Sequence, residues 1–259
     1  MSLVTKKLPE RRLGKYLVAI CPPTLDRVTA LIIGNHEIDA VLFDAGGIFV
    51  IPDPTVLAPL LSYYGATTDL AMYHRAHYRG MAAKSAAGSG ESDWGSYNVA
   101  YVETVGVPSH DVLEAATVLG RSRNAYTWRW PLADSVEALQ KLHQRNVPIG
   151  VVSNASGQIE DILARSAVCQ VGEGAGVPVR IVIDSHVVGV SKPDPRIFDF
   201  GLAAFTEFDR SRIAYVGDSV TMDIGGARNA GLVPLLLDPY DDHAGADFYR
   251  VKSLLELLA

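Results

Sequence analysis

Short apolar segments that end in a polar residue alternate with amphipathic helical segments along most of this chain. The apolar segments are five to eight residues long, as buried strands are, and the helical patterns that separate them run for eleven to thirteen residues. Parallel strands need a crossover of about this length, usually a helix. The sequence therefore predicts an α/β fold with a parallel sheet and helices on both faces. The predicted strands are residues 40–44, 147–154, 179–184, 212–218 and 232–238.

Residues 55–130 depart from this alternation because they contain helical patterns and few strand signals. The segment directly follows the first predicted strand, and ligands of open α/β sheets bind at the carboxyl ends of strands. We therefore expect a helical insertion that covers the ligand site, with a flexible break at residues 86–93. The expected organisation is an N-terminal extension (1–37), a core domain (38–54 and 131–259) and a helical cap (55–130).

Composition excludes several classes of protein. The chain has 259 residues with a net charge of −6, and it shows no basic stripe of the kind that binds nucleic acid. No segment approaches the roughly 20 apolar residues of a membrane span. Its two cysteines, Cys21 and Cys169, form no metal-binding motif and predict a reducing, cytoplasmic location. The sequence leaves the oligomeric state open.

The ends of four predicted strands carry residues with chemical potential. Carboxylates, a hydroxyl and an ammonium group meet at one edge if the strands are parallel. A carboxylate can attack phosphorus, while carboxylates with Mg²⁺ and a lysine neutralise a phosphoryl group. Hydroxyl and backbone N–H groups bind its remaining oxygens. The residues concerned are Asp44, Ser153, Asn154, Lys192, Asp218 and Asp223.

Around these residues, in four short motifs, the chain resembles the haloacid dehalogenase-like hydrolase superfamily. The four motifs occur in order as FDAGGIF, VVSN, SKPDPRIF and VGDSVTMD, over residues 40 to about 238. The resemblance implies a Rossmann-like three-layer core, a C1-type helical cap and phosphatase chemistry on a small phosphorylated metabolite through an aspartyl phosphate. Its implied nucleophile is Asp44.

The resemblance also implies how the other motif residues divide the work. Ser153 and Lys192 hold the phosphoryl group, with Asn154 and Gly47 as further phosphate-binding positions. Mg²⁺ sits on Asp44, the Gly46 carbonyl and Asp218, and Asp223 supports it.

One position departs from the pattern of the family's phosphatases. They carry an aspartate two residues after the nucleophile as general acid and base, and here that residue is Gly46. General acid–base catalysis contributes roughly 10²–10⁴-fold, so esters with poor leaving groups suffer most from its loss. Three hypotheses remain. In the first, the chain is a Mg²⁺ phosphatase with an easy substrate or with a substitute acid from His74, His77 or Asp53. In the second, it is a non-catalytic relative that binds a phosphorylated ligand or a partner. In the third, it is a 2-haloacid dehalogenase, and the intact GDxxxxD pattern argues against this hypothesis.

Within the predicted cap, the stretch YHRAHYRG places His74, Arg75 and His77 on one helix. The two histidines are three residues apart and share a face. These side chains suit an acidic substrate, and a solvated polar face is the alternative. Trp128 and Trp130 flank the return from the cap and favour hinge or core packing over substrate stacking.

Overall fold

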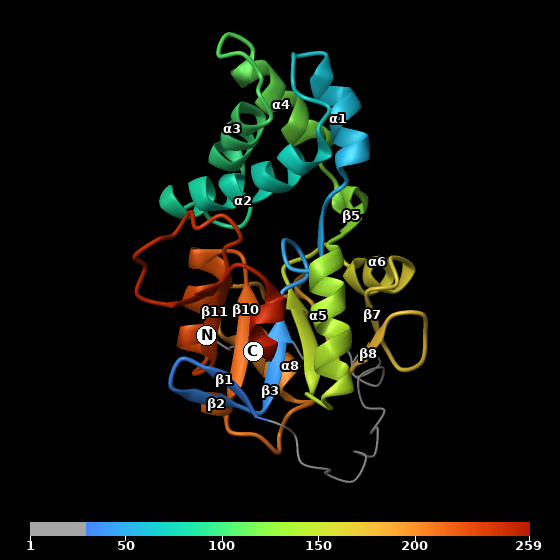
Figure 1. The fold of residues 1–259 in the computed structure, drawn as a ribbon, viewed down its shortest axis with the longest axis vertical. Helices are drawn as coiled ribbons and strands as arrows, with labels where there is room; N and C mark the ends of the chain where they lie inside the picture. Colours follow the sequence, from blue (N-terminus) through green and yellow to red (C-terminus); the bar gives the residue numbers. More distant parts are fainter. Residues whose placement is uncertain (1–29) are drawn as a thin grey trace, which may run out of the picture.

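The computed structural model describes residues 30–259, and a six-stranded sheet forms its centre (Figure 1). The order is β12-β11-β10-β3-β6-β9, and every neighbouring pair is parallel. The predicted α/β class is confirmed, and β12 is a sixth strand that the sequence did not predict. The strands are β3 (Ala40–Phe43), β6 (Ile149–Ser153), β9 (Val182–Asp184), β10 (Ile213–Gly217), β11 (Val233–Leu237) and β12 (Tyr249–Val251).

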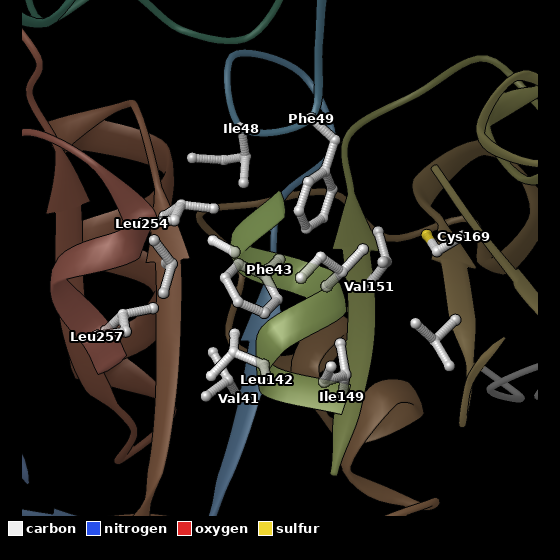
Figure 2. Close-up of a cluster of buried hydrophobic side chains, with 14 of the residues drawn as sticks. Val41, Phe43, Ile48, Phe49, Leu142, Ile149, Val151, Cys169, Leu254 and Leu257 are labelled. Carbon is white, nitrogen blue, oxygen red and sulfur yellow. The ribbon is translucent and has the colours of Figure 1, made fainter. Parts of the chain in front are cut away.

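Alternate residues of the central strand β3 belong to the two faces of the sheet. Val41 and Phe43 lie in a hydrophobic cluster with Leu142 of α5 (Ala133–Gln144), as Figure 2 shows. Ala40 and Leu42 lie in a second cluster with α8 (Arg196–Leu202). Because side chains of a strand alternate in direction, a strand that is buried on both faces is apolar throughout. This explains why the sequence signal for β3 is a continuous apolar run.

Shorter elements surround the sheet. The predicted strand over 179–184 is interrupted, because its first part pairs with β7 and its second part pairs with β6. Between the two parts, the Arg180 N–H donates to the Ile149 carbonyl at 2.8 Å. The elements concerned are β7 (Cys169–Val171) and β8 (Val177–Val179), and the remaining helical segments are α6 (Ile159–Arg165), α7 (Ser185–Val188), α9 (Gly225–Asn229), η3 (Arg210–Arg212), η4 (Val220–Ile224) and η5 (Leu254–Leu258).

The predicted N-terminal extension lies mostly outside the described residues, which begin at residue 30. The part that is described forms an antiparallel pair, β1 (Leu31–Ile33) and β2 (His36–Ile38). Leu31 and Ile33 are buried in the same hydrophobic cluster as Phe43. Leu31 and Ile33 therefore pack on the core, while the predicted boundary at residue 37 stays a prediction.

The helices α1 to α4 form a separate layer above the carboxyl end of the sheet (Figure 1). They pack around a hydrophobic cluster of their own that includes Leu57, Tyr73, Tyr97 and Val102. We call this layer the cap. Its helices are α1 (Pro54–Ser62), α2 (Leu70–Ala86), α3 (Gly95–Thr104) and α4 (Val112–Ser122).

Two antiparallel strands connect the cap to the core, β4 (Val50–Pro52) and β5 (Trp128–Pro131), the latter preceded by the short helix η2 (Ala125–Thr127). Asp53 ends the first connection and caps α1, since its side chain accepts from the Thr55 N–H. The domain boundaries at residues 54 and 131 stay a prediction. Among the described helices, none has both the length and the apolar character needed to cross a bilayer.

The packing of α5 on the sheet gives a direct test of the core. Leu142 is fully buried, whereas Leu113 on α4 is 76 % exposed. We expect Leu142→Ala to lower the free energy of unfolding by about 2–5 kcal/mol, because it removes buried apolar contacts and leaves a cavity. Leu113→Ala is the matched control, and its effect should stay within about 0.5 kcal/mol. Urea unfolding of both variants measures the difference, and equal losses would contradict this packing.

Candidate active site

The three acidic motif residues meet at the carboxyl edge of the sheet. Asp44 follows β3 and Asp218 follows its neighbour β10, while Asp223 lies on the turn η4. One carboxylate oxygen from each lies within 4.8 Å of the others, and all three residues are buried. The parallel strand order therefore gathers carboxylates that are 179 residues apart in the sequence.

Lys192 lies between two of these acids. Its Nζ atom is 2.7 Å from Asp223 Oδ1 and 3.0 Å from Asp44 Oδ1, and its side chain is almost fully buried. The ammonium group also donates to the Tyr215 hydroxyl at 2.8 Å. Burial acts to lower the pKa of Lys192, but Asp223 and Asp44 raise it, so the side chain stays charged.

Asn154 fixes the backbone of Lys192. Its Oδ1 atom accepts from the Lys192 N–H at 2.8 Å, and its Nδ2 donates to the Lys192 carbonyl at 3.1 Å. The same Nδ2 donates to Glu91 Oε2 of the cap at 2.7 Å. Asn154 thus lies next to the predicted phosphate site but is engaged in holding Lys192, and its phosphate contact stays a prediction. Ser153 is buried at the end of β6 and lines a cavity at this edge of the sheet, together with Asp44 and Lys192.

Asp223 supports the loop that carries Asp218. Its Oδ2 atom accepts from the N–H groups of Asp218 at 3.1 Å and Ser219 at 2.9 Å. A Cβ atom on Gly217 would lie 2.2 Å from Asp223 Cγ, so only glycine fits before Asp218. The VGD stretch is therefore shaped by the close approach of Asp223.

The donor set fits a divalent cation. When ionised, the three carboxylates and Lys192 carry two more negative than positive charges. Burial raises the pKa of Asp44 to about 7; Lys192 acts to lower it, while Asp223 and Asp218 add to the rise. Burial also raises the pKa of Asp218 well above its usual value. Asp44 Oδ1 has no hydrogen-bond donor in suitable geometry despite the nearby ammonium. Oxygen ligands of this kind hold hard cations.

Trp128 occupies the space beside Gly46. A Cβ atom at position 46 would lie 3.1 Å from Cζ3 of the Trp128 indole. The indole also packs edge-to-face against His77, with ring centroids 5.5 Å apart, and against Trp94 at 6.0 Å. The expectation that Trp128 packs at the hinge agrees with these contacts. A side chain at position 46 would require the indole to move.

Gly47 lies in a turn where a residue with a side chain would not fit. Its φ is +69°, and a Cβ atom there would lie 1.8 Å from Asp218 Oδ2. Its N–H donates to the Val50 carbonyl at 2.8 Å, and its carbonyl accepts from the Tyr78 hydroxyl at 2.7 Å. Both backbone groups are thus engaged within the protein, and the predicted phosphate contact of Gly47 stays a prediction.

His77 connects the cap to the core acids. Its ring is fully buried, with Nε2 2.9 Å from Asp218 Oδ2 and Nδ1 3.0 Å from the Tyr97 hydroxyl. Burial, with a further contribution from Arg123, lowers the pKa of His77 to about 3, so the imidazole is neutral. The alternative of a solvated polar face is therefore wrong for His77.

His74 and Arg75 contact the loop after β11 and do not line the cavity. His74 Nδ1 is 2.7 Å from the Tyr240 hydroxyl, and Arg75 makes a bidentate pair with Asp242, with Nη2 2.7 Å from Oδ1. The proposed substrate contacts of these two side chains are not supported. The loop over 238–245 thus holds α2 against the core, and we call this contact the clamp. Asp53 forms an ion pair with Arg129 of β5, in the connection between the cap and the core.

The cavity at this edge has a volume of about 270 Å³ and is lined by both layers. On the cap side, sequence reasoning missed its lining residues, since no motif or spacing marks them. Lys84 is one of them, and its ammonium donates to the carbonyls of Gly90 at 2.6 Å and Asp93 at 2.5 Å. The expected break at residues 86–93 is thus a loop wrapped around a buried lysine. Met81, Glu91, Trp94 and Arg123 of the cap also line the cavity, as do Asn124, Ala125 and Trp128 in the return to the core.

A family profile described as haloacid dehalogenase-like hydrolase matches residues 38–231. The chain belongs to this hydrolase family. The resemblance inferred from the four motifs is therefore confirmed.

Curated relatives match over part of their length. A pyrimidine 5'-nucleotidase, YjjG, from Escherichia coli K12 is 31 % identical over 49 % of this chain and 55 % of its own. A phosphoserine phosphatase from Thermus thermophilus is 33 % identical over 50 % of this chain and 51 % of its own. The chain thus spans about half the length of these relatives.

Solved structures of the family share the fold. The HAD-hydrolase YfnB from Bacillus subtilis, bound to magnesium, superposes with a TM-score of 0.54 at 18 % identity, covering 85 % of this chain and 96 % of that one. A dehalogenase with an intermediate complex superposes with a TM-score of 0.51 at 16 % identity, over 86 % and 96 %. At such identities the likeness concerns the fold alone.

The clamp between α2 and the loop after β11 generates a prediction. Asp242→Asn removes the charge that pairs with Arg75, and Asp247→Asn removes an exposed partner of Arg228 as the matched control. We expect backbone hydrogen exchange over α2 to rise roughly 5- to 30-fold in Asp242→Asn, equivalent to about 1–2 kcal/mol, and to stay unchanged in the control. Hydrogen exchange of α2 is measured by mass spectrometry in both variants, and equal exchange rates would contradict the clamp.

The same contact has a pH dependence with a defined sign. Hydrogen bonds from Arg75 hold the pKa of Asp242 below its usual value. At pH values above the usual pKa of an aspartate, the Arg75–Asp242 pair therefore stabilises the contact between α2 and the core. This stabilisation is lost as the pH falls through the pKa that Asp242 has in the folded state.

Proposed function

We propose that this chain is a Mg²⁺-dependent phosphohydrolase that cleaves a small phosphorylated metabolite through an aspartyl phosphate on Asp44. The proposal is supported above all by one observation: a buried cluster of three carboxylates with one lysine at the carboxyl edge of the sheet. Such a cluster neutralises a phosphoryl group only when a divalent cation joins it. The curated relatives named as phosphatases support the same reaction class.

Asp44, Asp218 and Asp223 would hold the Mg²⁺, with the Gly46 carbonyl as a further proposed ligand. When bound, the ion offsets the negative charge of the phosphoryl oxygens and favours the ionised form of the carboxylates around it. Lys192 contributes a fixed positive charge beside Asp44, at 3.0 Å from its Oδ1. Ser153, which lines the cavity, would donate its hydroxyl to a phosphoryl oxygen.

In the first step, a carboxylate oxygen of Asp44 forms a bond to phosphorus as the bond to the leaving oxygen breaks. In the second step, water attacks the same phosphorus, and the bond between phosphorus and the Asp44 oxygen breaks to release phosphate. The cap restricts bulk water, because His77, Tyr78 and Glu91 bond it to the core in this closed arrangement.

The leaving oxygen receives no proton from position 46. Gly46 has no side chain, and the indole of Trp128 fills the adjacent space. Leaving groups that depart readily as anions, such as those of acyl phosphates, are therefore the favoured substrates. His77 does not replace the missing acid in this arrangement, since its Nε2 is engaged with Asp218.

The size of the cavity supports a small substrate. Its volume of about 270 Å³ is below the roughly 300–1,000 Å³ of sites for drug-sized ligands. We propose no nucleic-acid or membrane partner, and the cytoplasmic location stays a prediction.

A second candidate function is binding of a phosphorylated ligand without turnover. The absence of an acidic side chain at Gly46 favours it, and the tight approach of the Trp128 indole, 3.1 Å from where a Cβ would lie, adds a packing cost to any residue there. The dehalogenase hypothesis is supported only by fold, and the complete acidic cluster argues against it.

Steady-state hydrolysis distinguishes the two candidates. We expect hydrolysis of acetyl phosphate that requires Mg²⁺, disappears in EDTA and falls at least about 10³-fold in Asp44→Asn. p-Nitrophenyl phosphate and glycerol 3-phosphate should be hydrolysed progressively more slowly, in the order of leaving-group basicity. Absence of Asp44-dependent turnover on all three substrates would reject the phosphohydrolase proposal in favour of ligand binding.

The contact between Gly46 and Trp128 yields a double-mutant test. Gly46→Asp alone should raise hydrolysis of glycerol 3-phosphate little, because the new Cβ lies 3.1 Å from the indole. Gly46→Asp combined with Trp128→Leu should raise kcat for this ester by about 10²-fold, relative to Trp128→Leu alone, by restoring a proton donor. Acetyl phosphate serves as the internal control, since it gains little from the acid. A folded double variant with no selective gain would refute this reading of position 46.

A further inference from the structure

The cavity has two sides with different charge. The core side carries the acidic cluster with Lys192, whereas the cap side is lined by Lys84, Glu91 and Arg123 among aromatic residues. In the proposed phosphohydrolase function, the motif residues on the core side take the phosphoryl group, so the cap side would face the leaving group of the substrate.

Arg123 is a cation on this side that has no carboxylate partner among residues 30–259. It follows the last residue of α4, and its guanidinium group lies 4.2 Å from the Trp94 ring centroid and 5.3 Å from that of Tyr97. Nη1 donates to Asn98 Oδ1 at 2.7 Å. Within residues 30–259, no carboxylate lies within 4.0 Å of its side-chain nitrogens. Burial lowers the pKa of Arg123, yet a guanidinium remains charged at all relevant pH values.

The neighbouring charges leave this side positive. The Lys84 ammonium donates to three backbone carbonyls, and no carboxylate neutralises it by direct contact among the described residues. Glu91 is the acid on this side, and its Oε2 already accepts from Asn154. Two positive charges and one engaged carboxylate therefore lie on this side, and because the Lys84 ammonium uses its three donors on backbone carbonyls, Arg123 is the cation with donors left for a ligand among the described residues.

We infer that the cap side of the cavity is a subsite for a second anionic group of the substrate, and that Arg123 recognises it. The inference rests on the proposed phosphohydrolase function, because that function assigns the phosphoryl group to the core side. The substrate class is a small phosphorylated compound, an ester or an acyl phosphate, whose leaving group carries a carboxylate or a second phosphate.

The local geometry suits this role. An arginine presents a planar set of donors that pairs with carboxylate or phosphate oxygens, and its guanidinium carbon lies over the Trp94 ring at 4.2 Å from the centroid. Asn98 holds one nitrogen and leaves other donors of the guanidinium group available. A neutral leaving group would leave this partly desolvated charge without a partner, whereas an anionic one would neutralise it.

Substrate discrimination tests the subsite. Three esters share one phosphate position and differ in the second group: 3-phosphoglycerate, glycerol 1,3-bisphosphate and glycerol 3-phosphate. We compare kcat/KM for the wild-type chain, Arg123→Gln and Arg121→Gln, the last being an exposed control on the same helix. We expect Arg123→Gln to lose roughly 10- to 100-fold on the anionic esters, as expected for a charged hydrogen bond, and to stay within about twofold on glycerol 3-phosphate. Arg121→Gln should match the wild type.

The outcomes separate the two sources of negative charge. Loss confined to 3-phosphoglycerate assigns a carboxylate, and loss confined to the bisphosphate assigns a second phosphate. Arg123→Lys should recover part of the lost discrimination, because it restores the charge without the planar donors. An equal loss on all three esters would show a merely structural role, and no loss on any would show no contact; both results overturn the inference.

A binding experiment keeps this test separate from the phosphohydrolase proposal. If the wild-type chain hydrolyses none of the esters, their binding is measured instead. The same three compounds are titrated by calorimetry into the Asp44→Asn chain in the presence of Mg²⁺, with and without Arg123→Gln. Weaker binding of the anionic esters alone in Arg123→Gln would support the subsite while the hydrolysis proposal fails. Unchanged preference, or no binding of any ester, would overturn the subsite as well.

Discussion

A lysine ammonium group buried between two carboxylates is the interaction on which the rest of this site depends. Lys192 neutralises part of the charge of Asp44 and Asp223, which burial would otherwise make unfavourable. It reaches this place because Asn154 bonds both backbone groups of Lys192 and because the Tyr215 hydroxyl accepts from its Nζ. Three strands of the sheet therefore contribute to holding one charge. The cluster remains net negative, and this excess accounts for its fit to a divalent cation.

The contact between Gly46 and Trp128 links the chemistry to the hinge. Trp128 begins β5, the strand that returns the chain from the cap, and its indole lies against the glycine that follows the nucleophile by two positions. The same ring packs on His77, which reaches Asp218. The space that an acid would need is thus part of the surface between cap and core. Restoring the acid is consequently a problem of packing as well as of chemistry.

A single cap helix makes most of the contacts that close the site. His77 and Tyr78 of α2 reach the core turn and Asp218, while Arg75 of the same helix pairs with Asp242. The residues proposed to select the substrate lie beyond this contact, at the end of α2 and after α4. Their position over the nucleophile therefore depends on how α2 docks. This arrangement separates the groups that carry the reaction from those proposed to choose the leaving group.

By itself, the sequence determined the α/β class, the order of the motif residues and the helical insertion, because strand-length apolar runs and strand-end polar residues are local signals. It predicted the convergence of Asp44, Asp218 and Lys192 for the same reason, since parallel strands bring their carboxyl ends to one edge. It missed the short strand β12 and misassigned Arg75, because a charged residue on a helix gives no sign of which distant loop it meets. Only the tertiary structure decided that Trp128 packs beside Gly46 and that Arg123 lines the cavity with no carboxylate partner among the residues that the structure describes. Both facts are contacts between segments far apart in the chain, and no local spacing encodes them.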